Sequence, residues 1–194
     1  SLVNQNRSEI GLSPNDLSNV IVSSTYLVPN TGIRMVYLQQ SYKDIPVYNQ
    51  LQSLAFRDGK LVSAAGSRVD FSMKLLAPES GVPATGAELA IRAAFTEAGI
   101  VTTAPVVLQN IKDRKLDFGR FHETYENVIA ELVWVPVEND RTVRLAWQVQ
   151  VAPARSDDFW LIRVDATNNT VIGKDNLTVY DNWHKEDGPS HTIN

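Results

Sequence analysis

The first third of the chain alternates apolar and polar residues with the period of a β-strand. Val36, Leu38 and Gln40 fall on one face of such a strand, and the residues between them fall on the other. Lys43-Asp44 and Asp58-Gly59 interrupt the alternation with residue types that favour turns. The pattern therefore predicts an antiparallel meander of three strands, over residues 33–42, 47–56 and 60–69.

Helical and extended segments precede this meander. Residues 1–10 end at Gly11, and glycine is common just past a helix C-terminus. Ser13-Pro14 opens a second predicted helix, since serine caps and proline fits the first helical position. Residues 20–28 are rich in β-branched side chains, which favour extended chain.

The second half opens on the clearest helical pattern in the chain. A segment with two prolines and a glycine, residues 78–83, predicts a linker. Thr85 and Glu88 then match a Thr-x-x-Glu capping box, and Gly99 marks the predicted end of the helix. Helical spacing places one apolar stripe on this segment: Ala87, Ile91, Ala94, Phe95 and Ala98.

Strands dominate the remainder of the second half. Turn residues at 138–140 and 167–169 separate β-branched and aromatic runs. The runs predict four strands, over residues 128–137, 142–151, 159–165 and 170–174. One strand carries a continuous apolar face: Leu145, Trp147, Val149 and Val151.

Each half thus reads as helix combined with antiparallel strands. We therefore predict an α+β fold with two modules, each with a helix packed on an antiparallel β-sheet. The predicted modules are residues 1–77 and 84–180, followed by a tail or connector at 181–194.

Composition narrows the function classes. The chain has 194 residues, a formal net charge of −4 and no cysteine. This charge gives no electrostatic case for nucleic acid, and the absence of cysteine excludes disulfides and thiolate chemistry. No apolar run approaches the roughly 20 residues that span a bilayer.

A search for catalytic residues finds none. The best match to a zinc peptidase helix is His122-Glu123, where the required second histidine is Glu126. Asp157 and Asp158 are adjacent, so on a strand they would point to opposite faces. The sequence therefore predicts no catalytic, cofactor-binding or metal-binding residue in this chain.

Two segments of the meander, residues 37–49 and 58–66, resemble the propeptide module of fungalysin and thermolysin metallopeptidases. The resemblance lies in a strand that ends in Gln-Gln, an Ile-Pro-Val-Tyr run, and an Asp-Gly turn before a small-residue strand. These residues are interpreted as architectural, because they set turns and strand register. The motif residues are Gln39, Gln40, Pro46, Asp58 and Gly59.

The second half resembles a PepSY module, which follows the first module in fungalysin-type precursors. Trp147 lies in the Leu-Ala-Trp-Gln-Val run at 145–149, and Asp165 lies in the Val-Asp-Ala run at 164–166. The chain departs from the family pattern where 167–169 reads Thr-Asn-Asn in place of a Thr-Gly pair. The tandem resemblance covers residues 8–180 and implies cystatin-like or PepSY-like modules.

The resemblance implies a non-catalytic pro-region that assists folding and inhibits a secreted zinc metallopeptidase of fungalysin type. Its partner would be the cognate peptidase domain, in cis or after cleavage, and the zinc would belong to that absent domain. The location implied is extracellular, with periplasmic transit as an alternative. The tail histidines His184 and His191 are candidates to face the protease. The competing hypothesis is a free-standing binding or peptidase-inhibitor module of the cell envelope.

Overall fold

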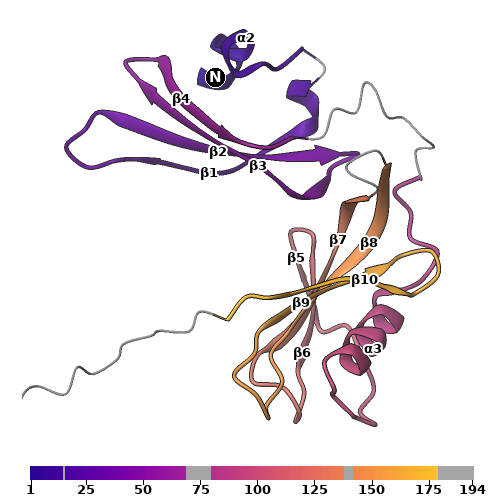
Figure 1. Cartoon of the computed structure of the whole chain (residues 1–194). Helices are drawn as coiled ribbons and strands as arrows, with labels where there is room; N and C mark the ends of the chain where they lie inside the picture. Colours follow the sequence, from indigo (N-terminus) through magenta and orange to yellow (C-terminus); the bar gives the residue numbers. More distant parts are fainter. Residues whose placement is uncertain (15, 69–79, 138–141, 179–194) are drawn as a thin grey trace, which may run out of the picture.

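The structure is a computed structural model that describes residues 1–14, 16–68, 80–137 and 142–178. Figure 1 shows the N-terminal strands above and the C-terminal strands below, with the two sheet regions at an angle to one another. The elements in chain order are α1 (Leu2–Gln5), α2 (Arg7–Ile10), the 3-10 helix η1 (Asp16–Asn19), β1 (Val20–Leu27), β2 (Ile33–Tyr42), β3 (Ile45–Arg57), β4 (Lys60–Gly66), α3 (Ala87–Glu97), β5 (Asn110–Lys112), β6 (Lys115–Arg120), β7 (Asn127–Val137), β8 (Thr142–Val151), β9 (Trp160–Asp165) and β10 (Val171–Asn176).

One path of paired strands runs through both halves of the chain. Its order is β1-β2-β3-β7-β8-β9-β10, with β4 on β3 and the β5–β6 hairpin on β7. Paired strands are antiparallel except where Val47 of β3 meets Trp134 of β7 in parallel. The assembly is therefore one mixed sheet of ten strands.

The predicted fold class, α+β with two modules that each pack a helix on an antiparallel sheet, is wrong. The fold is dominated by its sheet, since among the described residues only α3, with 11 residues, is a helix longer than four residues. The local patterns predicted strands but carried no sign that β3 would reach β7. The module limits 1–77, 84–180 and 181–194 stay predictions, and 69–79 and 179–194 lie outside the described residues.

The N-terminal strands bury one face under the first helices. Val36 and Leu38 of β2 pack with Leu54 and Phe56 of β3. Short apolar side chains from the helical segment, Val3, Ile10 and Leu12, close this core. Gly11 takes the left-handed conformation that was expected at the helix end, with φ +77°.

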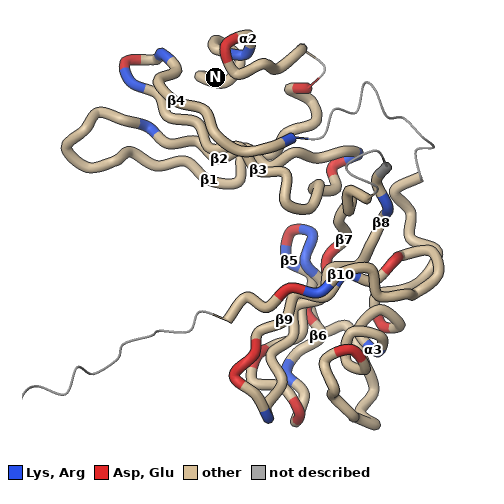
Figure 2. The backbone as a smooth tube through the Cα atoms, viewed as in Figure 1, with Lys and Arg blue, Asp and Glu red and all other residues tan. Residues whose placement is uncertain are grey.

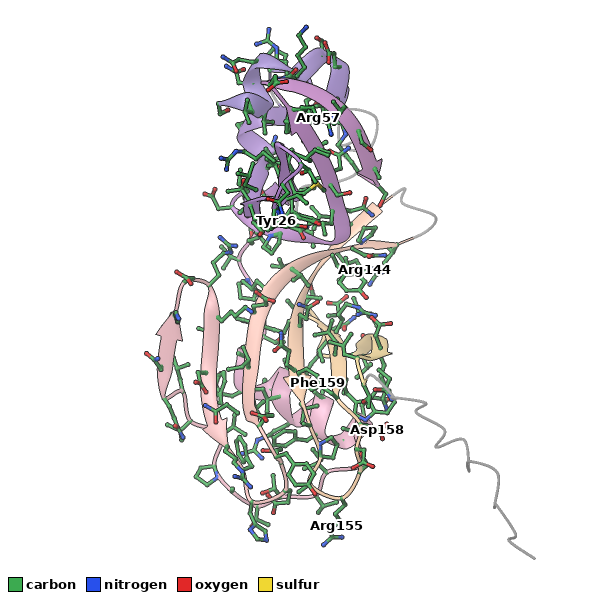
Figure 3. All side chains as sticks on the ribbon, turned by 90° about the vertical axis from the view of Figure 1, so that its left-hand side faces the viewer. Tyr26, Arg57, Arg144, Arg155, Asp158 and Phe159 are labelled. Atoms are coloured by element: carbon green, nitrogen blue, oxygen red, sulfur yellow. The ribbon has the colours of Figure 1, made fainter. Side chains whose placement is uncertain are left out.

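The larger core lies between α3 and the C-terminal strands. Figure 3 shows α3 behind the strands, so the opposite face of the sheet is turned to the viewer. The predicted stripe is confirmed: Ala87, Ile91, Ala94 and Phe95 are buried, and Ala98 packs at the margin. The predicted strand face is also confirmed, because it supplies the opposing surface: Leu145, Trp147, Val149 and Val151.

Two local predictions fail. The Thr85–Glu88 capping box does not form: the N-cap is Gly86, and the Thr85 hydroxyl donates to the Ala166 carbonyl at 3.1 Å. The sequence analysis also missed the β5–β6 hairpin. The long strands β2, β3, β7 and β8 lie where apolar alternation predicted them.

Candidate functional site

Gln39, near the end of β2, holds a bulge in β3 with its side-chain amide. Its Nε2 donates to the carbonyl oxygens of Val47 at 2.6 Å, Gln50 at 3.1 Å and Gln40 at 3.1 Å. The β2–β3 register shifts between Gln39 and Ser41, so residues 47–50 of β3 fall outside the pairing with β2. The amide donates to carbonyls of this stretch, which gives the first motif glutamine a structural role.

The neighbouring motif residues complete this bulge. Gln40 is 6% exposed, so the burial expected from its strand face is confirmed. Pro46 pairs with Ser41 at the start of β3, and Asn49 takes a left-handed φ of +56° inside the bulge. Left-handed backbone is tolerated better by asparagine than by most residues.

Gln39→Ala is expected to lower the free energy of unfolding by about 1–3 kcal/mol, because it leaves buried carbonyls without a donor. Urea denaturation measures the loss. Gln52→Ala is the matched control. Gln52, on β3, is half-buried like Gln39 but makes no side-chain hydrogen bond within the described ranges. Equal losses in the two variants would contradict the role assigned to Gln39.

The bulge carries β3 into the C-terminal half. Val47 is fully buried in the core under α3, and Ile45 packs against the same core. The indole Nε1 of Trp134 donates to the Tyr42 carbonyl at 2.9 Å. The Tyr42 and Trp134 rings lie 5.7 Å apart between centroids, in a tilted arrangement. The Ile-Pro-Val-Tyr motif therefore fastens one sheet region to the other.

Tyr48 forms a second contact between the two sheet regions, on the opposite face of the sheet. It packs against a small cluster that contains Val133, Val135 and Ala146. Its hydroxyl donates to Asp175 of β10, and the Arg163 guanidinium carbon lies 3.9 Å from its ring centroid. We call the residues that fasten the two sheet regions the joint: Tyr42, Ile45, Val47, Tyr48, Trp134, Arg163 and Asp175.

The polar part of the joint is tightly paired. Arg163 is 6% exposed, and its Nη1 lies 2.5 Å from Asp175 Oδ2. The hydrogen bond from Arg163 is the main cause that lowers the pKa of Asp175, and the Tyr48 hydroxyl adds to it. Burial and the bond to Asp175 raise the pKa of Tyr48. A Cβ on Gly173 would collide with the Arg163 guanidinium, so glycine leaves room for this arrangement.

The Asp175 carboxylate is expected to contribute stability that is lost in acid. Its folded pKa is depressed, so the contribution is complete above its ordinary pKa of 3.8 and disappears as the pH falls through that value toward the lower, folded one. Urea midpoints of wild type and Asp175→Asn should therefore differ at pH 7 and converge as the pH falls below 3.8. Glu126→Gln, which removes an exposed carboxylate outside the joint, is the control variant. A pH-independent effect of Asp175→Asn would contradict the assignment.

The remaining motif residues lie away from the joint. Asp58 and Gly59 form the β3–β4 turn with left-handed φ values of +51° and +78°. The Gly59 carbonyl accepts a hydrogen bond from the Asn6 amide at 3.0 Å, which ties the first helices to the meander. These two residues act in the architecture of the N-terminal sheet.

Trp147 and Asp165 hold the start of α3 and the β9–β10 turn. Trp147 Nε1 donates to the Thr85 carbonyl at 2.8 Å. Asp165 is 3% exposed and accepts hydrogen bonds from the Thr167 amide at 2.7 Å and the Arg144 guanidinium at 3.1 Å. Burial opposes ionisation, yet these bonds lower the pKa of Asp165.

The two tail histidines, His184 and His191, lie outside the described residues. His122 is exposed in the turn before β7. Within the ranges that the structure describes, no group of three or more His, Cys, Asp or Glu is placed to hold a metal ion. None of the described helices is long and apolar enough to cross a membrane.

One face of the N-terminal sheet carries no helix. Strand register places it opposite the α1–α2 side, and Figure 1 shows α2 above these strands and the C-terminal strands below them. Tyr26 and Tyr37 stack on it with centroids 6.2 Å apart. None of its large side chains belongs to a hydrophobic cluster of the described residues. We call it the open face: Ser24, Tyr26, Met35, Tyr37, Leu51, Ser53 and Ser63.

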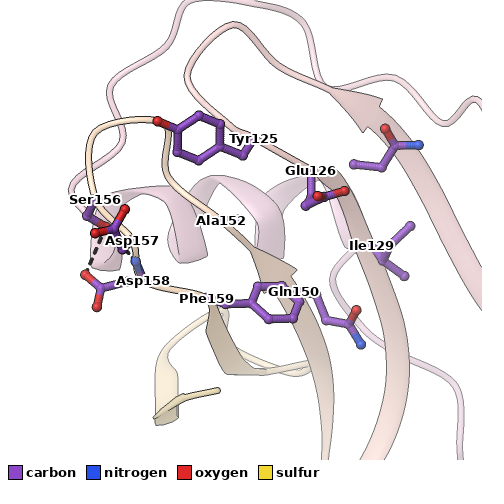
Figure 4. Close-up of a pocket in the computed structure, with 10 residues that line it drawn as sticks. Tyr125, Glu126, Ile129, Gln150, Ala152, Ser156, Asp157, Asp158 and Phe159 are labelled. Atoms are coloured by element: carbon purple, nitrogen blue, oxygen red, sulfur yellow. Dashed lines mark hydrogen bonds between the residues drawn. The ribbon is translucent and has the colours of Figure 1, made fainter. Parts of the chain in front are cut away.

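A groove of about 640 Å³ lies at the far end of the C-terminal sheet. Figure 4 shows Tyr125, Ile129 and Phe159 around it, with α3 behind the strands. Glu126, Asp157 and Asp158 are its charged lining residues, and no lysine or arginine lines it. Asp158 is held by the Ser156 hydroxyl at 2.9 Å. The adjacent aspartates lie in a loop before β9.

Sequence reasoning found the motif but missed what it contacts. Trp147, which lies on the apolar strand face predicted at 145–151, is buried, and so is Trp134. The roles of Tyr48, Arg163 and Asp175 were not foreseen, because Tyr48 is 127 residues from Asp175 in the chain. One usable signal existed: Arg163 interrupts the apolar strand 159–165, and a buried arginine requires a carboxylate or an aromatic partner.

Comparison with known proteins identifies part of the chain. Residues 19–67 match the Fungalysin/Thermolysin Propeptide Motif. A solved structure, the YpeB C-terminal domain of Bacillus megaterium, aligns over 91% of this chain and 65% of its own length, with 10% identity and a TM-score of 0.41. That similarity is too low to assign a fold. No curated protein matches the chain. The PepSY-like assignment of the second half stays a prediction.

Proposed function

We propose that the chain is the propeptide of a fungalysin-type zinc metallopeptidase, and that it assists the folding of that enzyme and inhibits it. The carrying observation is the propeptide motif at residues 19–67, together with the joint. Motif residues Ile45 and Val47 pack into the C-terminal core. Because these residues join the motif to the C-terminal strands, the two sheet regions can bind a partner as one unit.

The physical basis of both activities is mass action. A chain that binds the folded peptidase and not the unfolded one stabilises the folded enzyme. Tethering in one polypeptide raises the effective concentration to about millimolar, so even a modest contact area suffices before cleavage. Cleavage of the connector would end the tether and allow the peptidase to escape inhibition.

In this proposal, the peptidase domain carries out the catalysis. Zinc would be bound by the peptidase domain, and this chain would supply surface. The partner is the cognate peptidase, in cis or after cleavage. The extracellular location follows from a propeptide of a secreted enzyme, and His184 or His191 in the tail would face the protease.

Reading the gene sequence beyond Asn194 tests whether a peptidase domain follows this chain. We expect the same reading frame to continue into a domain with a His-Glu-x-x-His helix, whose histidines bind zinc and whose glutamate activates water. A stop codon shortly after Asn194, with no such domain, would contradict the propeptide and favour a free-standing envelope module.

A further inference from the structure

The strand β1, at one end of the sheet, has an outer edge that is open among the described residues. β1 pairs with β2 on one side only. Its eight residues, Val20–Leu27, include no charged residue, no proline and no glycine. An edge strand presents unpaired amide and carbonyl groups, which are a template for another strand. Proteins that avoid such pairing place charges or prolines on their edges.

The other outer strands of the described sheet carry that protection. Lys60 begins β4, Lys112 ends the short β5, and Lys174 lies near the end of β10. β1 is therefore the uncharged edge among the strands that the structure describes. The contrast indicates that the outer edge of β1 serves to bind another strand, since the other edges of the same sheet carry charged residues.

The β1 edge is continuous with the open face. Tyr26 of β1 is 48% exposed and stacks on Tyr37 of β2. Val22 and Leu27, which pair with Leu38 and Arg34 on the opposite face of the sheet, are 55% and 56% exposed. A strand added beside β1 would extend the open face and cover apolar side chains as well as pairing backbone groups. Figure 2 shows few coloured segments along β1 and β2, apart from one basic residue near the tip.

We propose that the outer edge of β1 takes up an extended, uncharged strand of the peptidase domain. This inference rests on the proposed function and names the surface through which it would act. Main-chain hydrogen bonds would supply affinity, and the partner strand lacks charges because an ion beside Val22 or Tyr26 would lose hydration without gaining a partner.

The geometry of β1 argues against a second copy as the occupant. The β1–β2 register shifts between Val22 and Ser24, in the middle of the strand. Two copies paired around a two-fold axis at the strand centre would set bulge against bulge, which disrupts a ladder. A peptidase strand is not tied to that symmetry, so it can lie along the whole of β1 without setting a bulge of its own opposite the shift between Val22 and Ser24.

A pair of lysine substitutions tests the edge. Ser24 on β1 and Ser63 on β4 are both exposed serines on the open face, but they lie on different edges of the sheet. The probe is the mature peptidase encoded downstream of residue 194, inhibited by each purified chain. Ser24→Lys should weaken inhibition about tenfold relative to wild type, and Ser63→Lys should leave it within about twofold.

Hydrogen exchange is measured on the wild-type chain, so its result does not depend on whether a variant folds. Amides of residues 20–27 should become protected when the peptidase is added, whereas those of β4 should change little. Inhibition by wild type with equal potency of the two variants and no new protection in β1 would overturn the edge proposal and leave the propeptide intact. Absence of inhibition by wild type, or of a downstream peptidase, would overturn both. Concentration-dependent protection of β1 without peptidase would assign the edge to a second copy and overturn the proposal.

Discussion

Trp134→Ala is expected to lower the free energy of unfolding by about 3–5 kcal/mol, the usual cost of truncating a large buried aromatic side chain. Trp134 is 1% exposed, and its indole donates to the Tyr42 carbonyl. It is also the parallel partner of Val47, so its loss opens a cavity at the point where the two sheet regions meet.

Urea denaturation followed by circular dichroism measures this loss. Trp160→Ala is the matched control, because Trp160 is only partly buried at the edge of the same core. Wild type should unfold in a single transition, and Trp134→Ala should separate the unfolding of the N-terminal and C-terminal strands. A loss no larger than that of Trp160→Ala would contradict the role given to the joint.

Refolding of the peptidase is expected to depend on this chain. Recovery of active enzyme from urea should rise at least about tenfold when the chain is present in equimolar amount, because about 1.4 kcal/mol of preferential stabilisation already gives that factor. Active-site titration of the refolded peptidase measures the recovery. The Trp134→Ala chain serves as the control and should assist less. Equal recovery with and without wild-type chain would contradict the folding role.

The sequence predicted those elements whose own residues carry the signal. Alternation in β2 and β8 and the stripe on α3 reflect burial of one face, and burial follows directly from side-chain chemistry. The β5–β6 hairpin was missed because all three residues of β5 are exposed, so no apolar face marks it. The capping box at Thr85 failed because the N-cap is one residue later, at Gly86, while the hydroxyl and the amide of Thr85 both donate to the carbonyl of Ala166, which is distant in sequence.

The joint could not be predicted, although its motif could. Gln39 and Val47 belong to a recognisable run, but their contacts depend on a bulge that a local pattern does not reveal. Tyr48 meets Arg163 and Asp175 across a large sequence separation, and only the folded sheet brings them together. The error in fold class has the same origin: periodicity describes strands singly and is silent about which strands become neighbours.

The central claim is that this chain inhibits the peptidase whose propeptide it is. Titration of the purified wild-type chain into the mature form of the proposed cognate peptidase, with peptide hydrolysis as the readout, tests it most directly. The account predicts saturable loss of activity at a one-to-one ratio and return of activity when the chain is cleaved. Full peptidase activity at a large excess of intact, folded chain would contradict it.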